Sequence, residues 1–323
     1  MPNNLKVLLI GAGQMALEYA KVLAALHIPY DVIGRGRKSA DAFAAATGVS
    51  VLGGSLHEYI DEKGIPDATI VAVSMDQLAR VTRDVISFGA KHILVEKPAG
   101  LNAQEVRSVG SVAGENGAKV FVGYNRRFYA SVLKALEIIK TDGGVTSFHF
   151  DFTEWSHTVE KLQHPPGILE NWFFANSTHV IDMAFFLGGR PKDISSYTAG
   201  GLSWHRTAIY SGAGISDTGA LFSYHANWCA PGRWMVEVMT ARHRLIFKPL
   251  EKLQIQEIGS LAADFVPIDD ALDTGFKPGL YRQTEEFLNQ RSGILLDIDN
   301  YIGNLEVVEA INKHAPATAA ADI

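Results

Sequence analysis

A glycine pattern near the start of the chain has the spacing that binds a nucleotide phosphate. Gly11, Gly13 and Ala16 fill the places of Gly-x-Gly-x-x-Gly/Ala directly after an apolar run. The first glycine allows a tight turn, the second lets a pyrophosphate approach the backbone, and the alanine lets a helix pack closely on its strand. Gln14 and Met15 open that helix, whose free N–H groups and positive end favour an anion.

The residues after the second predicted strand bear on the choice of cofactor. An NAD site places an acid about 20 residues beyond the glycines, where it accepts a hydrogen bond from the ribose 2'-hydroxyl. Asp31 has roughly that spacing, but it opens the strand Tyr30 to Ile33, so we expect Gly34 to face the ribose. Three cations follow, at Arg35, Arg37 and Lys38.

A guanidinium offers a planar fork of donors that suits a 2'-phosphate, whereas an acid would repel one. The sequence therefore predicts NADP(H) as the preferred cofactor, with NAD(H) possible. The alternative is that these cations are only the solvated, basic start of a helix.

The composition bounds the class of protein. A chain of 323 residues with 47% hydrophobic and 20% charged residues is typical of a soluble globular protein, and its length favours two domains. The net charge of -6 gives no general attraction to nucleic acid or to an anionic membrane. We therefore expect a small molecule as the partner, and neither nucleic acid nor membrane.

Cysteine usage and the start of the chain indicate a compartment. Cys229 is the only cysteine, which excludes an internal disulfide and a cysteine-rich zinc site, and no metal site is predicted. Residues Met1 to Lys6 lack the charged-then-apolar plan of a signal peptide, and no apolar run approaches the roughly 20 residues that span a bilayer. These features predict a cytoplasmic protein.

In residues 1–125, short apolar runs alternate with helical patterns, as a doubly wound parallel sheet requires. The predicted strands are Leu5 to Ile10, Tyr30 to Ile33, Ala68 to Val73, His92 to Val95 and Val120 to Val122. The helices expected between them include Gln14 to His27, Asp76 to Phe88 and Ala103 to Asn116. This part is predicted to be a dinucleotide-binding Rossmann domain of the α/β class.

Such a sheet binds its ligand outside the carboxyl ends of its strands. Several polar or flexible residues stand at these ends and are expected to contact the cofactor: Ser74, Met75, Glu96, Lys97 and Asn125. Together with the glycine turn and the basic run after Gly34, they make up the predicted cofactor site.

After Phe128 the pattern changes to strands with a period of two. A helix over Ala130 to Lys140 precedes them. The predicted strands are Val145 to Glu154, Asp193 to Ala199, Gly219 to Trp228, Trp234 to Thr240 and Arg244 to Phe247. Two helices, Leu280 to Gln290 and Ile298 to His314, close the chain.

Short connections between these strands, such as Ala241 to His243, indicate an open, mainly antiparallel sheet. Residues 126–323 are therefore predicted to be an α+β domain for substrate binding and oligomerisation. An open sheet needs cover, so a homo-oligomer through this sheet is expected.

Four motifs in order carry a family resemblance. They are Gly11-Ala12-Gly13-Gln14-Met15-Ala16, Lys91-His92-Ile93-Leu94-Val95-Glu96-Lys97-Pro98, Gly123-Tyr124-Asn125-Arg126-Arg127-Phe128 and His179-Val180-Ile181-Asp182. With these motifs the chain resembles the Gfo/Idh/MocA oxidoreductases over nearly its whole length. The resemblance implies a dehydrogenase or reductase that acts on a sugar, cyclitol or sugar nucleotide.

The resemblance also implies two catalytic residues, Lys97 at the reacting oxygen and His179 as a second proton-handling group. Hydride leaves a carbinol carbon only when the hydroxyl proton is removed, and the reverse reaction needs a proton for the alkoxide. A partly desolvated lysine and a histidine can both serve. In many family members an Asp stands four residues before the histidine, where this chain has Ala175, so Asn176 or Ser177 could orient His179, or the mechanism could lean on Lys97.

The same resemblance directs attention to aromatic and polar side chains for a hydroxylated ring. The residues expected to bind substrate are Arg127, Trp155, His157, Trp172, Asn176 and Asp182. Arg233 could meet a substrate anion or lie on the surface.

Structural alternatives remain for the predicted catalytic pair. Lys97 could be a surface lysine, and His179 could be a packed structural histidine. Two other functions stay open, a cofactor-sensing protein without turnover and a redox-neutral glycosidase that uses a bound cofactor.

Overall fold

A computed structural model describes residues 5–291 and 293–313 of the chain. Contacts between Cα atoms divide it into two compact units. One unit comprises Met1–Phe128 and Ala271–Gly303, and the other comprises Tyr129–Asp270 and Asn304–Ile323. No helix within the described ranges is both long and apolar enough to cross a membrane.

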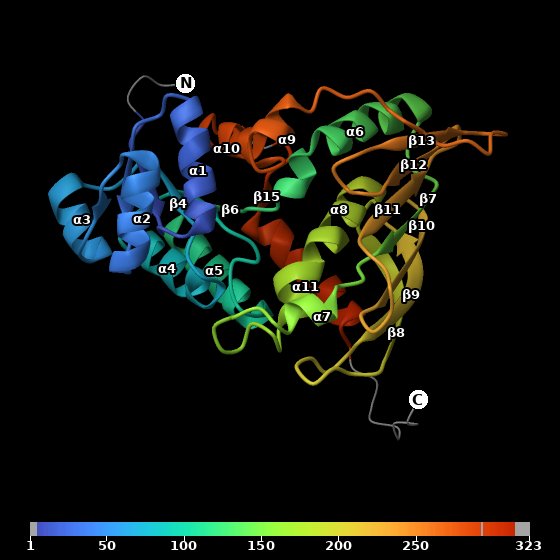
Figure 1. The fold of residues 1–323 in the computed structure, drawn as a ribbon, viewed down its shortest axis with the longest axis horizontal. Helices are drawn as coiled ribbons and strands as arrows, with labels where there is room; N and C mark the ends of the chain where they lie inside the picture. Colours follow the sequence, from blue (N-terminus) through green and yellow to red (C-terminus); the bar gives the residue numbers. More distant parts are fainter. Residues whose placement is uncertain (1–4, 292, 314–323) are drawn as a thin grey trace. The chain divides into compact units, whose positions relative to one another are not determined.

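The first unit is built on a mainly parallel sheet (Figure 1). Its described strands follow the order β15-β6-β5-β4-β1-β2-β3, and all neighbours run parallel except β15 and β6. The strands are β1 (Val7–Ile10), β2 (Tyr30–Ile33), β3 (Val51–Leu52), β4 (Ala68–Val71), β5 (His92–Val95), β6 (Lys119–Val122) and β15 (Leu296–Asp297). The order reverses between β1 and β4, which is where a doubly wound sheet binds its ligand. The predicted Rossmann sheet is confirmed.

Helices connect these strands because their apolar residues recur at helical spacing. They are α1 (Gln14–Ala25), α2 (Arg37–Thr47), α3 (Leu56–Lys63), α4 (Met75–Ser87) and α5 (Ala103–Asn116). In α4 the buried residues Leu78, Thr82 and Val85 lie three or four positions apart and form one face. Gly48 and Gly117 end α2 and α5 in left-handed backbone, which glycine adopts without strain.

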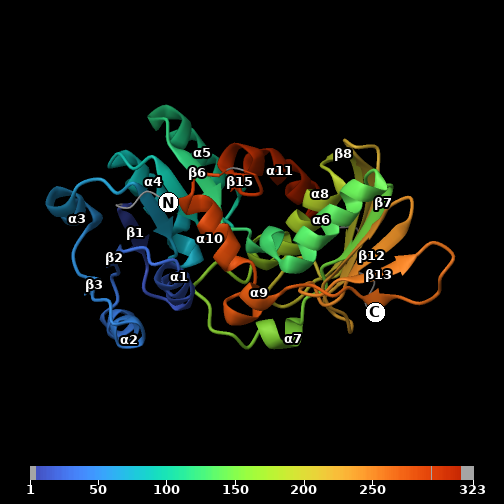
Figure 2. The same cartoon turned by 90° about the horizontal axis from the view of Figure 1, so that it is seen from above.

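The late segment Ala271–Gly303 belongs to the first unit, although the sequence prediction assigned it to the second domain. It contains α9 (Ala271–Gly275) and α10 (Leu280–Leu288), and α10 packs against α1, as Figures 1 and 2 show. The Phe287 ring stacks on His92 at 4.2 Å between ring centroids. These contacts join residues 195 or more positions apart in the chain, which strand and helix periodicity alone does not predict.

The second unit is built on a mainly antiparallel sheet, as predicted. Its described strands follow the order β14-β13-β12-β11-β7-β10-β9-β8, with one parallel pair, β10 and β7. The strands are β7 (Ser147–Asp151), β8 (Pro191–Ala199), β9 (Ile209–Ser216), β10 (Leu221–Asn227), β11 (Met235–Met239), β12 (His243–Phe247), β13 (Gln254–Glu257) and β14 (Asp264–Phe265).

The helices of this unit are α6 (Ala130–Asp142), α7 (Ser156–Val159), the π-helical turn η2 (Phe173–Ser177) and α8 (Thr178–Gly188). Helices α6 and α8 pack against the sheet, and η2 packs against α8 (Figure 1). Helix α8 packs on β7 and β11, where Phe148, Phe150 and Phe185 form a buried aromatic core. Helix α11 (Ile298–Ile311) ends the described fold, and His314, the last residue of the predicted helix, lies outside the described residues.

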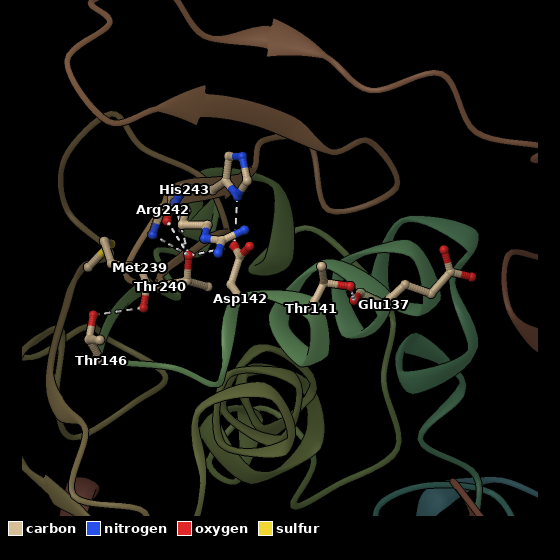
Figure 3. Close-up of polar contacts among 8 residues, drawn as sticks. All are labelled: Glu137, Thr141, Asp142, Thr146, Met239, Thr240, Arg242 and His243. Carbon is tan, nitrogen blue, oxygen red and sulfur yellow. Dashed lines mark hydrogen bonds and ion pairs between the residues drawn. The ribbon is translucent and has the colours of Figure 1, made fainter.

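A polar cluster joins the end of α6 to the turn between β11 and β12 (Figure 3). Asp142 accepts hydrogen bonds of 2.7 Å from the Thr240 hydroxyl and from His243 Nδ1. Although burial raises the pKa of the Asp142 carboxyl, these hydrogen bonds and the nearby positive charges lower it on balance. The cluster therefore holds the hairpin to the helix most firmly when Asp142 is ionised.

Candidate functional site

The glycine turn has the geometry of a phosphate cradle. Gly11 adopts φ +123°, and a Cβ there would lie 2.2 Å from the Ala72 carbonyl oxygen, so only glycine fits. Gly13 precedes α1 with extended backbone, and a Cβ on it would meet no protein atom within 4 Å. The first turn of α1 carries no acidic side chain and no side-chain cap. Open space and available N–H groups thus meet at a helix N-terminus, as an anion requires.

A cavity of about 750 Å³ opens beside this turn, within the first unit. Seven of the predicted cofactor residues line it, namely Gly11, Gly13, Gln14, Met15, Gly34, Arg35 and Ser74. Six others stand outside its lining, namely Arg37, Lys38, Met75, Glu96, Lys97 and Asn125. The cavity has the size of a small-molecule or cofactor site.

Sequence reasoning missed part of this lining. Ser55 and His57 at the start of α3 also face the cavity, as do Arg80 and Asp84 along α4 and Phe88 directly after it. Ser55 caps α3 through a reciprocal pair with Glu58, a sequence signature of a helix start. Recognising that capping box would have placed α3, but not the side of the sheet on which it packs.

The loop after β2 is the part of the cavity that bears on cofactor choice. Asp31 accepts a hydrogen bond of 3.0 Å from the Tyr59 hydroxyl and is not among the lining residues. A Cβ on Gly34 would lie 3.0 Å from Val51 Cγ1, so an acidic side chain would fit there only if neighbours moved. Arg35 lines the cavity, and its Nη2 donates to Gln77 Oε1 at 3.3 Å.

Lys97 follows β5 and is half-buried beside a buried acid. Its neighbour Glu96 is 7% exposed and accepts a hydrogen bond of 2.7 Å from the Tyr19 hydroxyl, which in turn accepts one of 3.1 Å from Gln283 Nε2. Burial raises the pKa of Glu96, against the lowering effects of the Tyr19 hydrogen bond and the Lys97 charge. The carboxyl end of β5 thus places an ammonium next to a fixed, buried carboxyl group.

Two predicted residues after β6 make contacts inside the first unit. Asn125 is 5% exposed and donates to the Pro278 carbonyl at 2.8 Å. Arg127 is 8% exposed and its Nη1 donates to the Ile294 carbonyl at 3.4 Å. Both side chains tie the strand end to the late segment of the unit, and their roles toward cofactor and substrate stay predictions.

In the second unit, His179 stands in the first turn of α8 and is buried. Its ring centroid lies 6.3 Å from that of Trp234. The guanidinium of Arg233 lies over Trp234 at 4.4 Å and over Trp155 at 4.6 Å. Arg233 is therefore held between two indole rings, a cation–π arrangement that fixes its plane.

Glu154 is the residue of this neighbourhood that sequence reasoning missed. Asn176 Nδ2 donates to both of its carboxylate oxygens, at 3.1 and 3.0 Å, and the Ser177 hydroxyl donates at 2.9 Å. Arg233 Nη1 lies 3.7 Å from Glu154 Oε2. No motif marks Glu154 in the sequence. It could have been found as an acidic residue that closely follows a strand of the apolar core.

The remaining predicted substrate residues differ in exposure. Trp155 is 49% exposed, and its indole N–H donates to the Gly232 carbonyl at 2.9 Å. His157 is exposed on α7, and Asp182 is half-buried on α8, three residues after His179. Trp172 is buried, with its ring beside those of His164 and Trp204. An exposed platform for a ring is therefore offered by Trp155 more than by Trp172.

Within the described residues, no group of three or more His, Cys, Asp and Glu side chains could hold a metal ion. The donors at the glycine turn are N–H groups and a guanidinium, which suit phosphate and not a cation.

Comparison with known proteins relates part of the chain to a known family. Residues 5–124 match the model of the Gfo/Idh/MocA oxidoreductase family, described as having an NAD-binding Rossmann fold. Inositol 2-dehydrogenase of Rhizobium meliloti is 28% identical over 205 residues, which are 59% of this chain and 57% of that protein. The match thus spans little more than half the length of that relative.

Solved structures are similar over most of the chain. A putative NADPH-dependent oxidoreductase of Desulfitobacterium hafniense has a TM-score of 0.79 at 19% identity, over 96% of this chain and 95% of that one. Levoglucosan dehydrogenase in complex with NADH has a TM-score of 0.77 at 18% identity, over 96% of each chain. At these identities the likeness establishes the fold.

Proposed function

Because residues 5–124 belong to the Gfo/Idh/MocA oxidoreductase family with its NAD-binding Rossmann fold, we propose that this protein is a nicotinamide-dependent oxidoreductase. Its substrate is a sugar, cyclitol or sugar nucleotide, oxidised or reduced at a hydroxyl or carbonyl carbon. The single observation that carries the proposal is the cavity that the glycine turn lines, where Gly11 at φ +123° has no room for a Cβ and Gly13 leaves open space beside a helix N-terminus. A bound pyrophosphate requires backbone without side chains at such a place.

The residues that would hold the cofactor are those of the cavity. The N–H groups after Gly13 receive the pyrophosphate, and the loop from Gly34 to Arg35 receives the ribose. When bound, the nicotinamide accepts or supplies the hydride. A preference for NADP(H) is supported by the crowding at Gly34, which opposes an acid, and by Arg35, whose fork of donors suits a 2'-phosphate.

Lys97 and His179 are proposed to handle the proton of the reacting oxygen. In the oxidative direction Lys97 in its amine form takes the hydroxyl proton, and in the reductive direction its ammonium returns one to the alkoxide. Burial raises the pKa of the adjacent Glu96 carboxyl, and the Lys97 charge acts against that rise. His179 is the second group able to exchange that proton near neutral pH.

The substrate class is supported by the second unit and by the named relative. Trp155 offers a partly exposed ring, and His157 and Asp182 offer polar groups of the kind that bind hydroxyls. Inositol 2-dehydrogenase, by its name, acts on a cyclitol. We further propose that the two units serve cofactor and substrate binding respectively, and that the open sheet of the second joins copies of the chain.

The test is Lys97→Met, assayed by nicotinamide absorbance against a panel of sugars, cyclitols and sugar nucleotides. Methionine keeps the length of the side chain and removes the amine, so turnover should fall ~10² to 10⁴-fold while the dissociation constant for NADPH stays nearly unchanged. Lys119→Met is the matched control, because Lys119 is exposed at the opposite, amino end of β6.

Unchanged turnover in Lys97→Met would remove Lys97 from the proton path. Cofactor binding without turnover on any of the substrates would favour a sensor, and product release without net absorbance change would favour a glycosidase.

A further inference from the structure

Glu154 is a buried acid that the proposed reaction does not yet use. Its side chain is 1% exposed. Burying a carboxylate is costly unless hydrogen bonds replace its water, and apolar side chains of similar volume often stabilise a fold equally well. Here two consecutive residues, Asn176 and Ser177, donate hydrogen bonds to the carboxylate in place of water. Burial nevertheless raises its pKa, against the lowering effects of the Ser177 hydrogen bond and the Arg233 charge.

The backbone on both sides of Glu154 is fixed. The Thr153 N–H donates to Asp151 Oδ1 at 2.7 Å, and the Thr153 hydroxyl accepts from the Asn227 N–H at 3.0 Å. On the other side, the Ser156 hydroxyl donates to the Trp228 carbonyl at 2.6 Å. The carboxylate is thus presented from an anchored segment at the ends of β7 and β10 and is not carried on a loose loop.

The donors to Glu154 stand directly before the helix that bears His179. Asn176 and Ser177 end the π-helical turn η2, and α8 begins at the next residue, Thr178. A π-helical turn departs from regular helical hydrogen bonding, and such turns occur often at functional sites. The Glu154 contacts hold the end of this turn two and three residues ahead of His179.

A second route from Glu154 approaches the imidazole from the other side. Arg233 faces Glu154 at 3.7 Å and lies on the ring of Trp234, and Trp234 is the indole that lies 6.3 Å from the His179 ring. The carboxylate therefore contacts both the segment that leads into the His179 helix and the arginine that lies on Trp234.

We propose that Glu154 is a positioning residue for His179. It sets the start of α8 through Asn176 and Ser177 and sets the Trp234 wall through Arg233. This inference rests on the proposed function in one respect, the proton-handling role of His179.

The experiment is a double-mutant cycle of Glu154→Gln and His179→Ala, measured on the full chain with NADPH and the substrate that the panel identifies. Glutamine is isosteric, but an NH₂ group replaces one of the two acceptor oxygens. One of the contacts with the Asn176 amide then brings two hydrogen-bond donors together. In the wild-type background kcat should fall about 10- to 100-fold, the loss expected when a reacting group is displaced by about 1 Å. In the His179→Ala background the same change should lower kcat less than about threefold, since coupled residues are not additive.

Three controls separate positioning from general damage. Glu237→Gln, on the same sheet and paired with Arg244, should leave kcat unchanged. The NADPH dissociation constant of Glu154→Gln should match that of the wild type, because the cofactor cavity belongs to the first unit. If Glu154→Gln does not fold, Ser177→Ala removes one of the same hydrogen bonds from the opposite side and should show the same dependence on His179.

Equal losses of kcat in both backgrounds, or an unchanged kcat in Glu154→Gln, would overturn the positioning role while leaving the proposed function intact. An unchanged kcat in His179→Ala alone would instead show that the proposed role of His179 is wrong, and this inference would be overturned with it.

Discussion

Gly11 and Gly13 stand two residues apart, yet the structure predicts opposite consequences for the same substitution. At Gly11, alanine would be forced into φ +123° with its Cβ 2.2 Å from the Ala72 carbonyl oxygen. Backbone strain of about 1 to 3 kcal/mol and a similar overpacking cost give a destabilisation of about 2 to 6 kcal/mol. At Gly13, φ is -88° and the added methyl meets no protein atom within 4 Å, so the cost is about 1 kcal/mol, the loss of a better N-cap residue.

Gly13→Ala, the variant with the smaller effect on stability, is expected to weaken cofactor binding. The Gly13→Ala methyl occupies the space in which a pyrophosphate would approach the N–H groups of α1, and each charge-assisted hydrogen bond lost there costs about 1.5 to 3 kcal/mol. The affinity for NADPH should therefore fall at least about tenfold. At a cofactor concentration 100 times the wild-type dissociation constant, ligand stabilisation should then drop from about 2.7 to about 1.4 kcal/mol.

Urea unfolding with and without NADPH, together with calorimetric titration, measures both quantities on one set of proteins. Without cofactor, Gly13→Ala should lose only about 1 kcal/mol of stability. Its response to NADPH should be about half that of the wild type. Wild-type affinity in Gly13→Ala would show that the open space is not the phosphate cradle. A loss of more than about 2 kcal/mol of stability in Gly13→Ala without cofactor would show that the space is filled by the chain in solution.

Two further predictions concern Arg35 and Asp142. Arg35→Ala should lower the affinity for NADPH about tenfold or more and the affinity for NADH less than about threefold, as measured by titration. The control Arg83→Ala should change neither affinity, because Arg83 contacts Ser108 and is not among the cavity-lining residues. An equal loss for both cofactors would contradict the 2'-phosphate role. The Asp142 carboxyl has a lowered pKa in the folded state, so its contribution is present above the unfolded pKa of about 3.9 and is lost as the pH falls through the folded value. Asp142→Asn should lower the free energy of unfolding by about 1 to 3 kcal/mol at pH 7 and make it depend less on pH in the acid range. A mutant with the wild-type pH dependence would show that other carboxyl groups cause it.

The parts of the molecule that the sequence predicted are those governed by local rules. Strand β1, the turn at Gly11 and helix α1 follow from an apolar run, a glycine spacing and a helical period within 20 residues. The parts it did not predict depend on distant partners. Strand β15 has only two residues and exists because Leu296 pairs with Val122, and α10 belongs to the first unit because it packs on α1. No window of local sequence contains that information.

The same distinction explains why one carboxyl group was nominated from the sequence and the other was not. Glu96 is adjacent to Lys97 in the chain, so any motif that marks the lysine marks the acid with it. Glu154 lies more than 20 residues from Asn176 and Ser177, and its position was apparent only once a strand end and a helix start were brought together. Yet the two acids share their physics. Each is buried, each has its pKa raised by burial, and each accepts a hydrogen bond from a buried hydroxyl, that of Tyr19 for Glu96 and that of Ser177 for Glu154. A fold retains such costly groups where their charge orients or stabilises a neighbour, which is why Glu154 is better explained by its effect on His179 than by the stability of the sheet end on which it stands.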